Sequence, residues 1–277
     1  MTTTLAATKV IGEERMLLEN ISWDTYEALS DNLGEQSPGV HLAYDNGSLE
    51  IMTVSHGHER YGRLIGRLIE SLTFELDIPI RGGGSTTLKR KLKKKGLEPD
   101  ECYWTQNEAR IRGKRKLVLP NDPPPDLAVE VEITRTVLDR LPIYAAFGVP
   151  EIWRFDGEEL HVHELHKGRY REKKQSLAFP FLPLDKIVEF IQQIDETSLI
   201  RSFIDWVRSD ILPAYEEKKD EDSRQQQQAA LTSPRRSAMN VVGKILAADA
   251  GAPLAIVAGM DDGNLARVRW NKSCSRR

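Results

Sequence analysis

Cysteine is scarce in this 277-residue chain: the two cysteines, Cys102 and Cys274, lie far apart and form no CxxC pair. Their spacing supports neither a disulfide framework nor a zinc site, so both are expected to be free thiols in a reducing compartment. The first ten residues lack the basic start and apolar core of a secretory signal, and no apolar run reaches the roughly 18–20 residues that a membrane helix needs. We therefore expect a cytoplasmic protein with no membrane partner.

A large excess of positive charge is also missing, because the formal net charge is −3. The chain as a whole therefore has no basic signature of a nucleic-acid-binding protein. Lysine and arginine gather instead in two local clusters, at residues 81–95 and 110–116. These clusters predict contacts with a phosphate backbone, and solvated loops are the alternative. The residues expected to contact nucleic acid are Lys89, Arg90, Lys91, Lys93, Arg112 and Lys114.

Acidic residues on a short apolar strand are the most informative feature that the chain does contain. Three prolines at 123–125 lead into a predicted strand over residues 126–133. Side chains alternate with period two along a strand, so Asp126, Glu130 and Glu132 share one face and apolar side chains share the other. Neighbouring carboxylates on one face lie about 6–7 Å apart, which is costly unless a cation lies among them. A divalent metal, a lysine or arginine, or exposure on an edge strand would each relieve that cost.

A second acidic segment, ending in Pro99-Asp100, precedes the acidic strand. It is typical of a turn that enters a β-prone run. The order is then Pro-Asp followed, thirty positions after Asp100, by Glu130 and Glu132 in a Glu-x-Glu pattern. This order is close to the layout of the PD-(D/E)XK nucleases, in which a Pro-Asp at one strand end precedes an acid-x-Lys on the neighbouring strand.

The chain resembles the Uma-two-type restriction endonucleases, a branch of the PD-(D/E)XK superfamily. The resemblance covers roughly residues 20–210 and rests on His58-Glu59, on residues 96–100, on the acidic strand and on the run over residues 138–154. It implies an α/β fold with a restriction-endonuclease-like core, in which helices flank a mixed central sheet. It also implies hydrolysis of DNA phosphodiester bonds with Mg²⁺ or Mn²⁺ as the cofactor. DNA is then the expected partner, and a homodimer stays open.

The same resemblance assigns roles to individual residues. Asp100 and Glu130 would hold the metal ion, and Glu59 would add a carboxylate that binds metal or positions water. The alternative for Glu59 is that it complements the dipole of its helix. The lysine of the superfamily would fall at Glu132, so Arg140 on the following helix is expected to supply positive charge; its guanidinium cannot act as a base. A weakened scaffold that binds DNA without cutting it is the alternative function.

The predicted organisation has three parts: an N-terminal arm over residues 1–20, the restriction-endonuclease-like domain over residues 21–215, and a low-complexity extension over residues 216–277 that is expected to be disordered. Within the domain, Asn46-Gly47 predicts a β-hairpin over residues 39–54. Apolar residues spaced three and four apart predict a helix from about residue 56 to residue 76. A further helix is expected over residues 138–147, with Gly148 at its C-terminal end.

Overall fold

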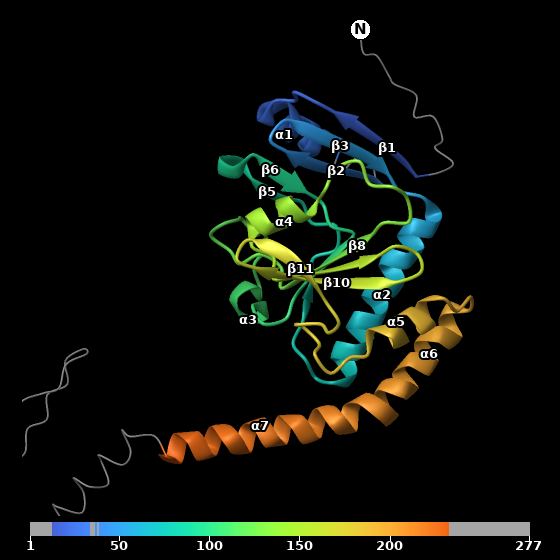
Figure 1. The fold of residues 1–277 in the computed structure, drawn as a ribbon, viewed down its shortest axis with the longest axis vertical. Helices are drawn as coiled ribbons and strands as arrows, with labels where there is room; N and C mark the ends of the chain where they lie inside the picture. Colours follow the sequence, from blue (N-terminus) through green and yellow to red (C-terminus); the bar gives the residue numbers. More distant parts are fainter. Residues whose placement is uncertain (1–12, 34–36, 38, 233–277) are drawn as a thin grey trace, which may run out of the picture. The chain divides into compact units, whose positions relative to one another are not determined.

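The computed structural model of the chain describes residues 13–33, 37 and 39–232. It divides into two units, Met1–Lys219 and Asp220–Arg277. The first unit contains two β-sheets and the helices that pack on them (Figure 1). Of the predicted extension, the structure describes residues 216–232 as part of helix α7 (Leu212–Thr232). Residues 1–12 of the predicted arm, residues 233–277 and Cys274 lie outside the described residues.

The first sheet has five antiparallel strands in the order β1-β3-β2-β6-β5. They are β1 (Glu14–Leu18), β2 (Val40–Asp45), β3 (Ser48–Thr53), β5 (Leu88–Arg90) and β6 (Lys95–Leu97). The hairpin predicted around Asn46-Gly47 is confirmed, since Asp45 pairs with Ser48 and both turn residues have positive φ. Helix α1 (Trp23–Leu33) covers this sheet, and its Tyr26 stacks on Tyr44 of β2. The sequence did not predict this separate sheet.

The second sheet has six strands in the order β11-β10-β9-β8-β7-β4. They are β4 (Arg81–Gly82), β7 (Glu101–Trp104), β8 (Leu127–Val131), β9 (Glu151–Phe155), β10 (Leu160–His166) and β11 (Arg169–Lys173). Strands β8 and β9 are parallel and all other pairs are antiparallel. The predicted α/β class with a mixed sheet and flanking helices is therefore confirmed.

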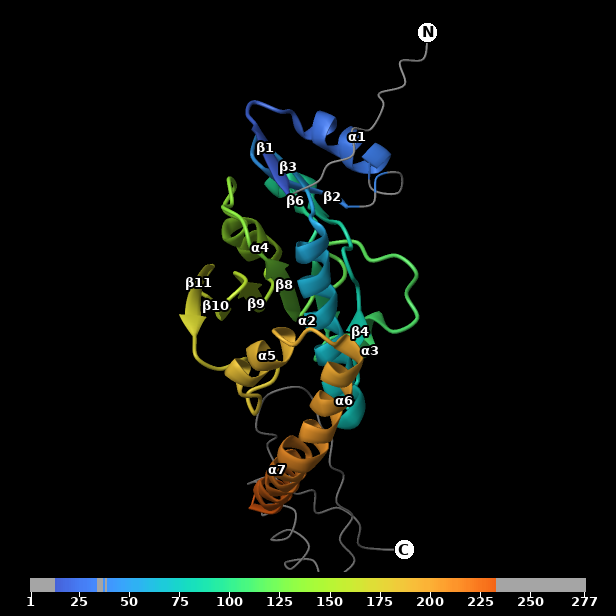
Figure 2. The ribbon, with the colours of Figure 1, turned by 90° about the vertical axis from the view of Figure 1, so that its right-hand side faces the viewer.

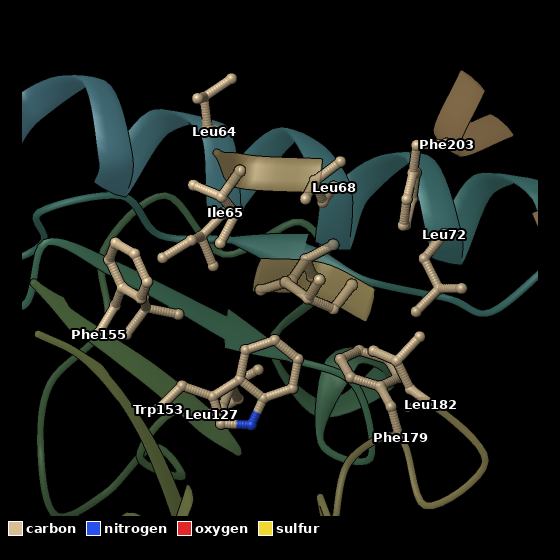
Figure 3. Close-up of a cluster of buried hydrophobic side chains, with 14 of the residues drawn as sticks. Leu64, Ile65, Leu68, Leu72, Leu127, Trp153, Phe155, Phe179, Leu182 and Phe203 are labelled. Carbon is tan, nitrogen blue, oxygen red and sulfur yellow. The ribbon is translucent and has the colours of Figure 1, made fainter. Parts of the chain in front are cut away.

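Helix α2 (His56–Glu75) lies along one face of the second sheet, with α5 (Leu184–Ile191) and α6 (Glu196–Trp206) beside it (Figures 1 and 2). Its N-terminus is capped by the Ser55 hydroxyl, which accepts a hydrogen bond from the backbone N–H of His58. The apolar stripe of α2 is buried against the strands and α6 (Figure 3). This burial, more than helix propensity, fixes α2 over the sheet.

Strand β8 has two different faces, as its period-two pattern predicted. Leu127, Val129 and Val131 pack in the core that contains α2. Ala128 packs on the opposite face with Ile143, which belongs to α4 (Leu141–Phe147). Glu130 lies on this second face, so its carboxylate is directed away from α2 and toward α4.

Helix α4 begins at Leu141, three residues later than the predicted start at residue 138. Pro142 explains the difference, because proline lacks an N–H and is favoured in the first helical turn. Asp139 accepts a hydrogen bond from the backbone N–H of Leu141, which satisfies one N–H of that turn. Gly148 ends the helix with φ of 83°, as predicted.

The shorter helices complete the first unit. They are a 3₁₀ turn at Lys91–Lys93, α3 (Glu108–Ile111) and a π-helical segment, Val207–Ile211, that continues α6 toward α7. No helix in the described part of the chain is both long enough and apolar enough to cross a membrane.

Candidate active site

A cavity of about 380 Å³ lies beside the N-terminal half of α2. Its wall is formed by α2, by β2, by the loop after β4 and by the start of β7. The residues on this wall are His41, His58, Glu59, Gly62, Arg63, Gly66, Arg67, Glu70, Gly84, Ser85, Asp100 and Glu101. The residues predicted to be catalytic are Asp100, Glu130, Glu132, Arg140 and Glu59. Of these five, Asp100 and Glu59 share the wall of this cavity.

Asp100 is fixed at the end of the second sheet, immediately before β7. Its Oδ2 accepts a hydrogen bond of 2.7 Å from the backbone N–H of Val131, at the end of β8. Glu101 pairs with Val129, so Asp100 and Glu130 occupy the next positions of the same antiparallel ladder. The prediction that these two acidic residues lie on neighbouring strands is confirmed.

The other oxygen of Asp100 faces two histidine rings. Its Oδ1 lies 2.9 Å from Nε2 of His58 and 3.3 Å from Nδ1 of His41. All three atoms are buried, and none is aligned for a hydrogen bond. Polar atoms that converge in this way need a proton or a cation between them. The position of His41 at this point was not predicted, because β2 lies in the other sheet.

The charges of Asp100 and His58 depend on each other. Burial would raise the pKa of Asp100, but the two histidine rings outweigh burial and hold it well below its usual range. Burial would lower the pKa of His58, but the Asp100 carboxylate outweighs it and raises that pKa. His58 therefore favours the imidazolium form, with its Nδ1 3.2 Å from Oε2 of Glu13.

Glu130 is held by two residues around α4. Its Oε2 accepts a 2.7 Å hydrogen bond from Nη1 of Arg140, and its Oε1 accepts one from the hydroxyl of Tyr144. Arg140 also donates from Nη2 and Nε to Oε2 of Glu50, at 2.8 and 3.2 Å. Arg140 is 4% exposed and Glu50 is 0% exposed, so this is a buried ion triad. Arg140 thus lies beside the acidic face of β8, and it also binds Glu50 of β3.

The pKa shifts within this triad oppose each other. Burial raises the pKa of Glu130 to about 7, which is more than Arg140 lowers it. The pKa of Arg140 rises far above its usual value, because Glu130 and Glu50 outweigh the effect of burial. The first shift favours a protonated Glu130 and the second requires carboxylates. We assign Glu130 the carboxylate form, because a guanidinium does not lose its proton and needs an anionic partner when buried.

A chain of alternating charges links the two predicted metal ligands. Glu50 Oε1 lies 3.2 Å from Nη1 of Arg15, and Nη2 of Arg15 lies 2.9 Å from Oε1 of Glu13. The other oxygen of Glu13 contacts His58. The N-terminal strand β1 and the residue before it are therefore part of the site. Sequence reasoning missed this, because the contacts of Arg15 with Glu50 and of Glu13 with His58 join residues 35 and 45 positions apart in the sequence.

Glu132, which was expected at the position of the superfamily lysine, follows the end of β8 and is not on the cavity wall. It forms a salt bridge with Arg154 of β9. This contact gives its charge a structural partner within the sheet.

Glu101 is a cavity residue that the sequence did not single out. Burial raises its pKa to about 7, and the nearby carboxylates of Glu70 and Asp100 add to the shift. Its position next to Asp100 in the sequence could have identified Glu101 as a candidate site residue. Glu59, by contrast, is exposed on the first turn of α2.

The six basic residues predicted to contact nucleic acid all have partners within the protein. Their partners are acidic side chains or the backbone carbonyl of Ala146. The contacts are Lys89 with Asp31, Arg90 and Lys93 with Ala146, Lys91 with Asp24 and Glu27, Arg112 with Glu108, and Lys114 with Asp122. Exposed ion pairs contribute little to stability, so a phosphate could replace such partners at small cost.

The donor groups at Asp100 fit a hard divalent cation. Within residues 13–33, 37 and 39–232, no three histidine, cysteine or acidic side chains are grouped as ligands of one metal ion. Mg²⁺ does not need such a group, because it commonly takes one or two carboxylates and fills its remaining positions with water and substrate phosphate. Asp100 Oδ1 is a buried carboxylate oxygen beside a polar cavity, with the rings of His58 and His41 at 2.9 and 3.3 Å. Each oxygen of Glu130 accepts one hydrogen bond and keeps a further lone pair.

The fold and the cavity define an α/β protein in which acidic and basic side chains line one site. A model of the family described as "Uma2: Putative restriction endonuclease" matches residues 23–194. The chain belongs to this family, as its resemblance indicated. The match includes His58, Asp100, Glu130 and Arg140, but not Glu13 or Arg15.

Among solved structures, the chain is similar to one described as "a putative nuclease belonging to DUF820 from Anabaena variabilis ATCC 29413". The two share 12% sequence identity with a TM-score of 0.39, over 66% of this chain and 99% of that one. No curated protein matches the chain.

Proposed function

We propose that the protein is a divalent-metal-dependent endonuclease that hydrolyses DNA phosphodiester bonds at the cavity beside Asp100. The observation that supports this best is the buried carboxylate of Asp100 on the wall of that cavity, held there by His41, His58 and the backbone N–H of Val131. Membership of a restriction endonuclease family agrees with nucleic-acid hydrolysis. Arginines on the same wall suit an anionic substrate.

Asp100 is the proposed metal ligand, and Glu130 is the proposed second carboxylate. When bound, Mg²⁺ or Mn²⁺ would supply Lewis acidity toward the phosphate and lower the pKa of its water. His41 and His58 hold the Asp100 carboxylate in place, and Arg140 and Tyr144 hold that of Glu130.

Glu59 and Glu132 have different proposed roles. Glu59 has an exposed carboxylate on the cavity wall and is proposed to position water. Neither Glu130 nor Glu132 is on that wall, but Glu130 lies beside Asp100 across the β7–β8 ladder, whereas Glu132 follows β8 and pairs with Arg154, so Glu132 is left out of the proposed catalytic set.

Nicking of supercoiled plasmid tests this proposal. We expect the wild-type protein to nick the plasmid with Mg²⁺ or Mn²⁺ and to be inactive in EDTA. Asp100→Asn should reduce the rate at least roughly 100-fold, since it removes the ligand charge. Arg169→Ala, a substitution on β11, is the control and should cut as the wild type does. A wild-type protein that is inactive with both metals would contradict the proposal.

A DNA-binding module without catalysis is the second candidate. It is favoured by one observation: both oxygens of Glu130 already accept hydrogen bonds, from Arg140 and Tyr144. DNA binding by the wild-type protein without cleavage under either metal would support this reading over the first.

A further inference from the structure

Arg63 is one of the residues on the cavity wall. It lies on α2, four residues after Glu59 and four before Arg67, so all three side chains share one face of the helix. It is also next to the point where α2 approaches Asp100: a Cβ atom at Gly62 would lie 3.7 Å from the Cβ of Asp100. The guanidinium of Arg63 is therefore attached close to the proposed reaction centre.

Arg63 has no partner among the described residues, unlike Arg60 and Arg67 on the same helix. The side chain is exposed, and no hydrogen bond or salt bridge of Arg63 is found in the part of the chain that the structure describes. Arg67 lies 2.9 Å from Glu196, and Arg60 contacts Glu196 and the carbonyl of Gln193. Of the two arginines on the cavity wall, only Arg63 is thus free to bind a ligand without losing a contact in this part of the molecule.

The charges on the cavity wall favour the binding of a phosphate together with a metal cation. The wall places four carboxylates near Arg63, those of Glu59, Glu70, Asp100 and Glu101. A guanidinium among carboxylates selects for a phosphate, whose geometry matches its fork, once a metal ion offsets the acidic charge. A phosphate at the two basic clusters would have to replace the partners that their six predicted residues already have within the protein, whereas Arg63 has no such contact to lose.

We propose that Arg63 binds a backbone phosphate of the DNA strand whose phosphodiester lies at Asp100. This inference rests on the proposed function and names the residue that positions its substrate. Arg63 is a positioning residue, whereas Asp100 belongs to the catalytic centre. The contact is with the backbone and carries no base information, so it applies to DNA of any sequence.

Fluorescence anisotropy tests the proposal by measuring the binding of a labelled DNA duplex in Ca²⁺ over a series of salt concentrations. A duplex of about 20 base pairs is long enough, because it offers more phosphates than one site needs. We expect Arg63→Ala to weaken binding roughly tenfold, as for loss of a charged hydrogen bond. The slope of log affinity against log salt should fall by about one unit, as for one phosphate contact. Arg63→Lys should keep most of the slope, because the charge remains.

Arg169→Ala is the matched control. Arg169 is also exposed, and it lies on β11, at the edge of the second sheet opposite β4. Its substitution removes the same charge and should leave the affinity and the salt slope near those of the wild type. If Arg63→Ala and Arg169→Ala behave alike while the wild-type protein nicks plasmid, the Arg63 proposal is wrong and the proposed function stands. If the wild-type protein neither binds DNA nor nicks plasmid, both are overturned.

Discussion

Arg140 is the residue on which the buried charge of Glu130 and Glu50 depends. Arg140→Ala should lower the free energy of unfolding by about 3–5 kcal/mol, because it leaves the buried Glu130 carboxylate without its cation and leaves Glu50 with Arg15 alone. Arg140→Lys should cost less, since it keeps the charge but loses the planar fork. Urea unfolding measures both effects. If Arg140→Ala unfolds within about 1 kcal/mol of the wild type, the triad is not the ion pair described here.

The second prediction at this scale concerns His58. Asp100→Asn should lower the pKa of His58, because the carboxylate that raises it is gone. NMR titration of the ring measures this. The ring of His161 on β10 is the control, since Glu172 raises its pKa and is untouched by the change. An unchanged His58 pKa would mean that Asp100 is not its partner.

The same pair predicts how stability varies with pH. The contribution from His58 is fully present below its unfolded-state pKa of roughly 6.5. Because the folded-state pKa is raised, this contribution is lost as the pH rises through that folded value. The free energy of unfolding of the wild type should therefore decrease more between pH 6 and pH 9 than that of Asp100→Asn.

At the scale of elements, two glycines of α2 differ in how closely they approach the second sheet. A Cβ atom at Gly66 would lie 2.7 Å from the hydroxyl of Tyr103, a ring that is fully buried. At Gly62 the nearest atom would be 3.7 Å away, which is ordinary contact. Gly66→Ala should therefore destabilise the protein by about 1–3 kcal/mol, because the buried ring must move.

Gly62→Ala is the matched control within the same helix. Alanine is favoured over glycine in helices by roughly 0.5–1 kcal/mol, so this variant should equal or exceed the wild type in stability. Thermal unfolding of the two variants compares them directly. Equal destabilisation by both would show that α2 does not lie as close to β7 at Gly66 as described.

The sequence predicted correctly the elements that depend on only a few neighbouring residues. The Asn46-Gly47 hairpin, the two faces of β8 and the Gly148 helix end follow from turn chemistry, side-chain alternation and left-handed backbone preference. The start of α4 was predicted three residues too early. The apolar spacing already begins at residue 138, whereas Pro142 lies in the first turn of the helix, which begins at Leu141.

The candidate site was predicted only in part, because its contacts are long-range. Asp100 and Glu130 were correctly placed on neighbouring strands. The contact of Arg140 with Glu50 spans 90 residues, and that of Arg15 with Glu50 spans 35. No local periodicity encodes which strands of two sheets face each other. The partners of Arg140 and the position of His41 were therefore not predictable from the pattern.

At the scale of the whole molecule, the first unit contains the described hydrophobic clusters. Their members, including the partly buried side chains, lie between Leu18 and Tyr215. Truncation after Lys219 should therefore preserve the fold, with a thermal midpoint within about 5 °C of the wild type. Calorimetry of the truncated and full-length chains measures this. A larger decrease would show that residues 220–277 stabilise the first unit.

Binding of Mn²⁺, followed by calorimetry without DNA, tests most directly whether Asp100 holds the catalytic cation. We expect the wild-type protein to bind Mn²⁺, more weakly at pH 5.5 than at pH 7.5, because the metal competes with protons for the Asp100 and His58 pair. Asp100→Asn should weaken binding at least roughly 100-fold and Glu130→Gln by less, since the amide keeps one acceptor oxygen. Glu132→Gln, which affects only the pair with Arg154, should bind as the wild type does. If Asp100→Asn binds Mn²⁺ as tightly as the wild-type protein, the metal site is not at Asp100 and the account is wrong.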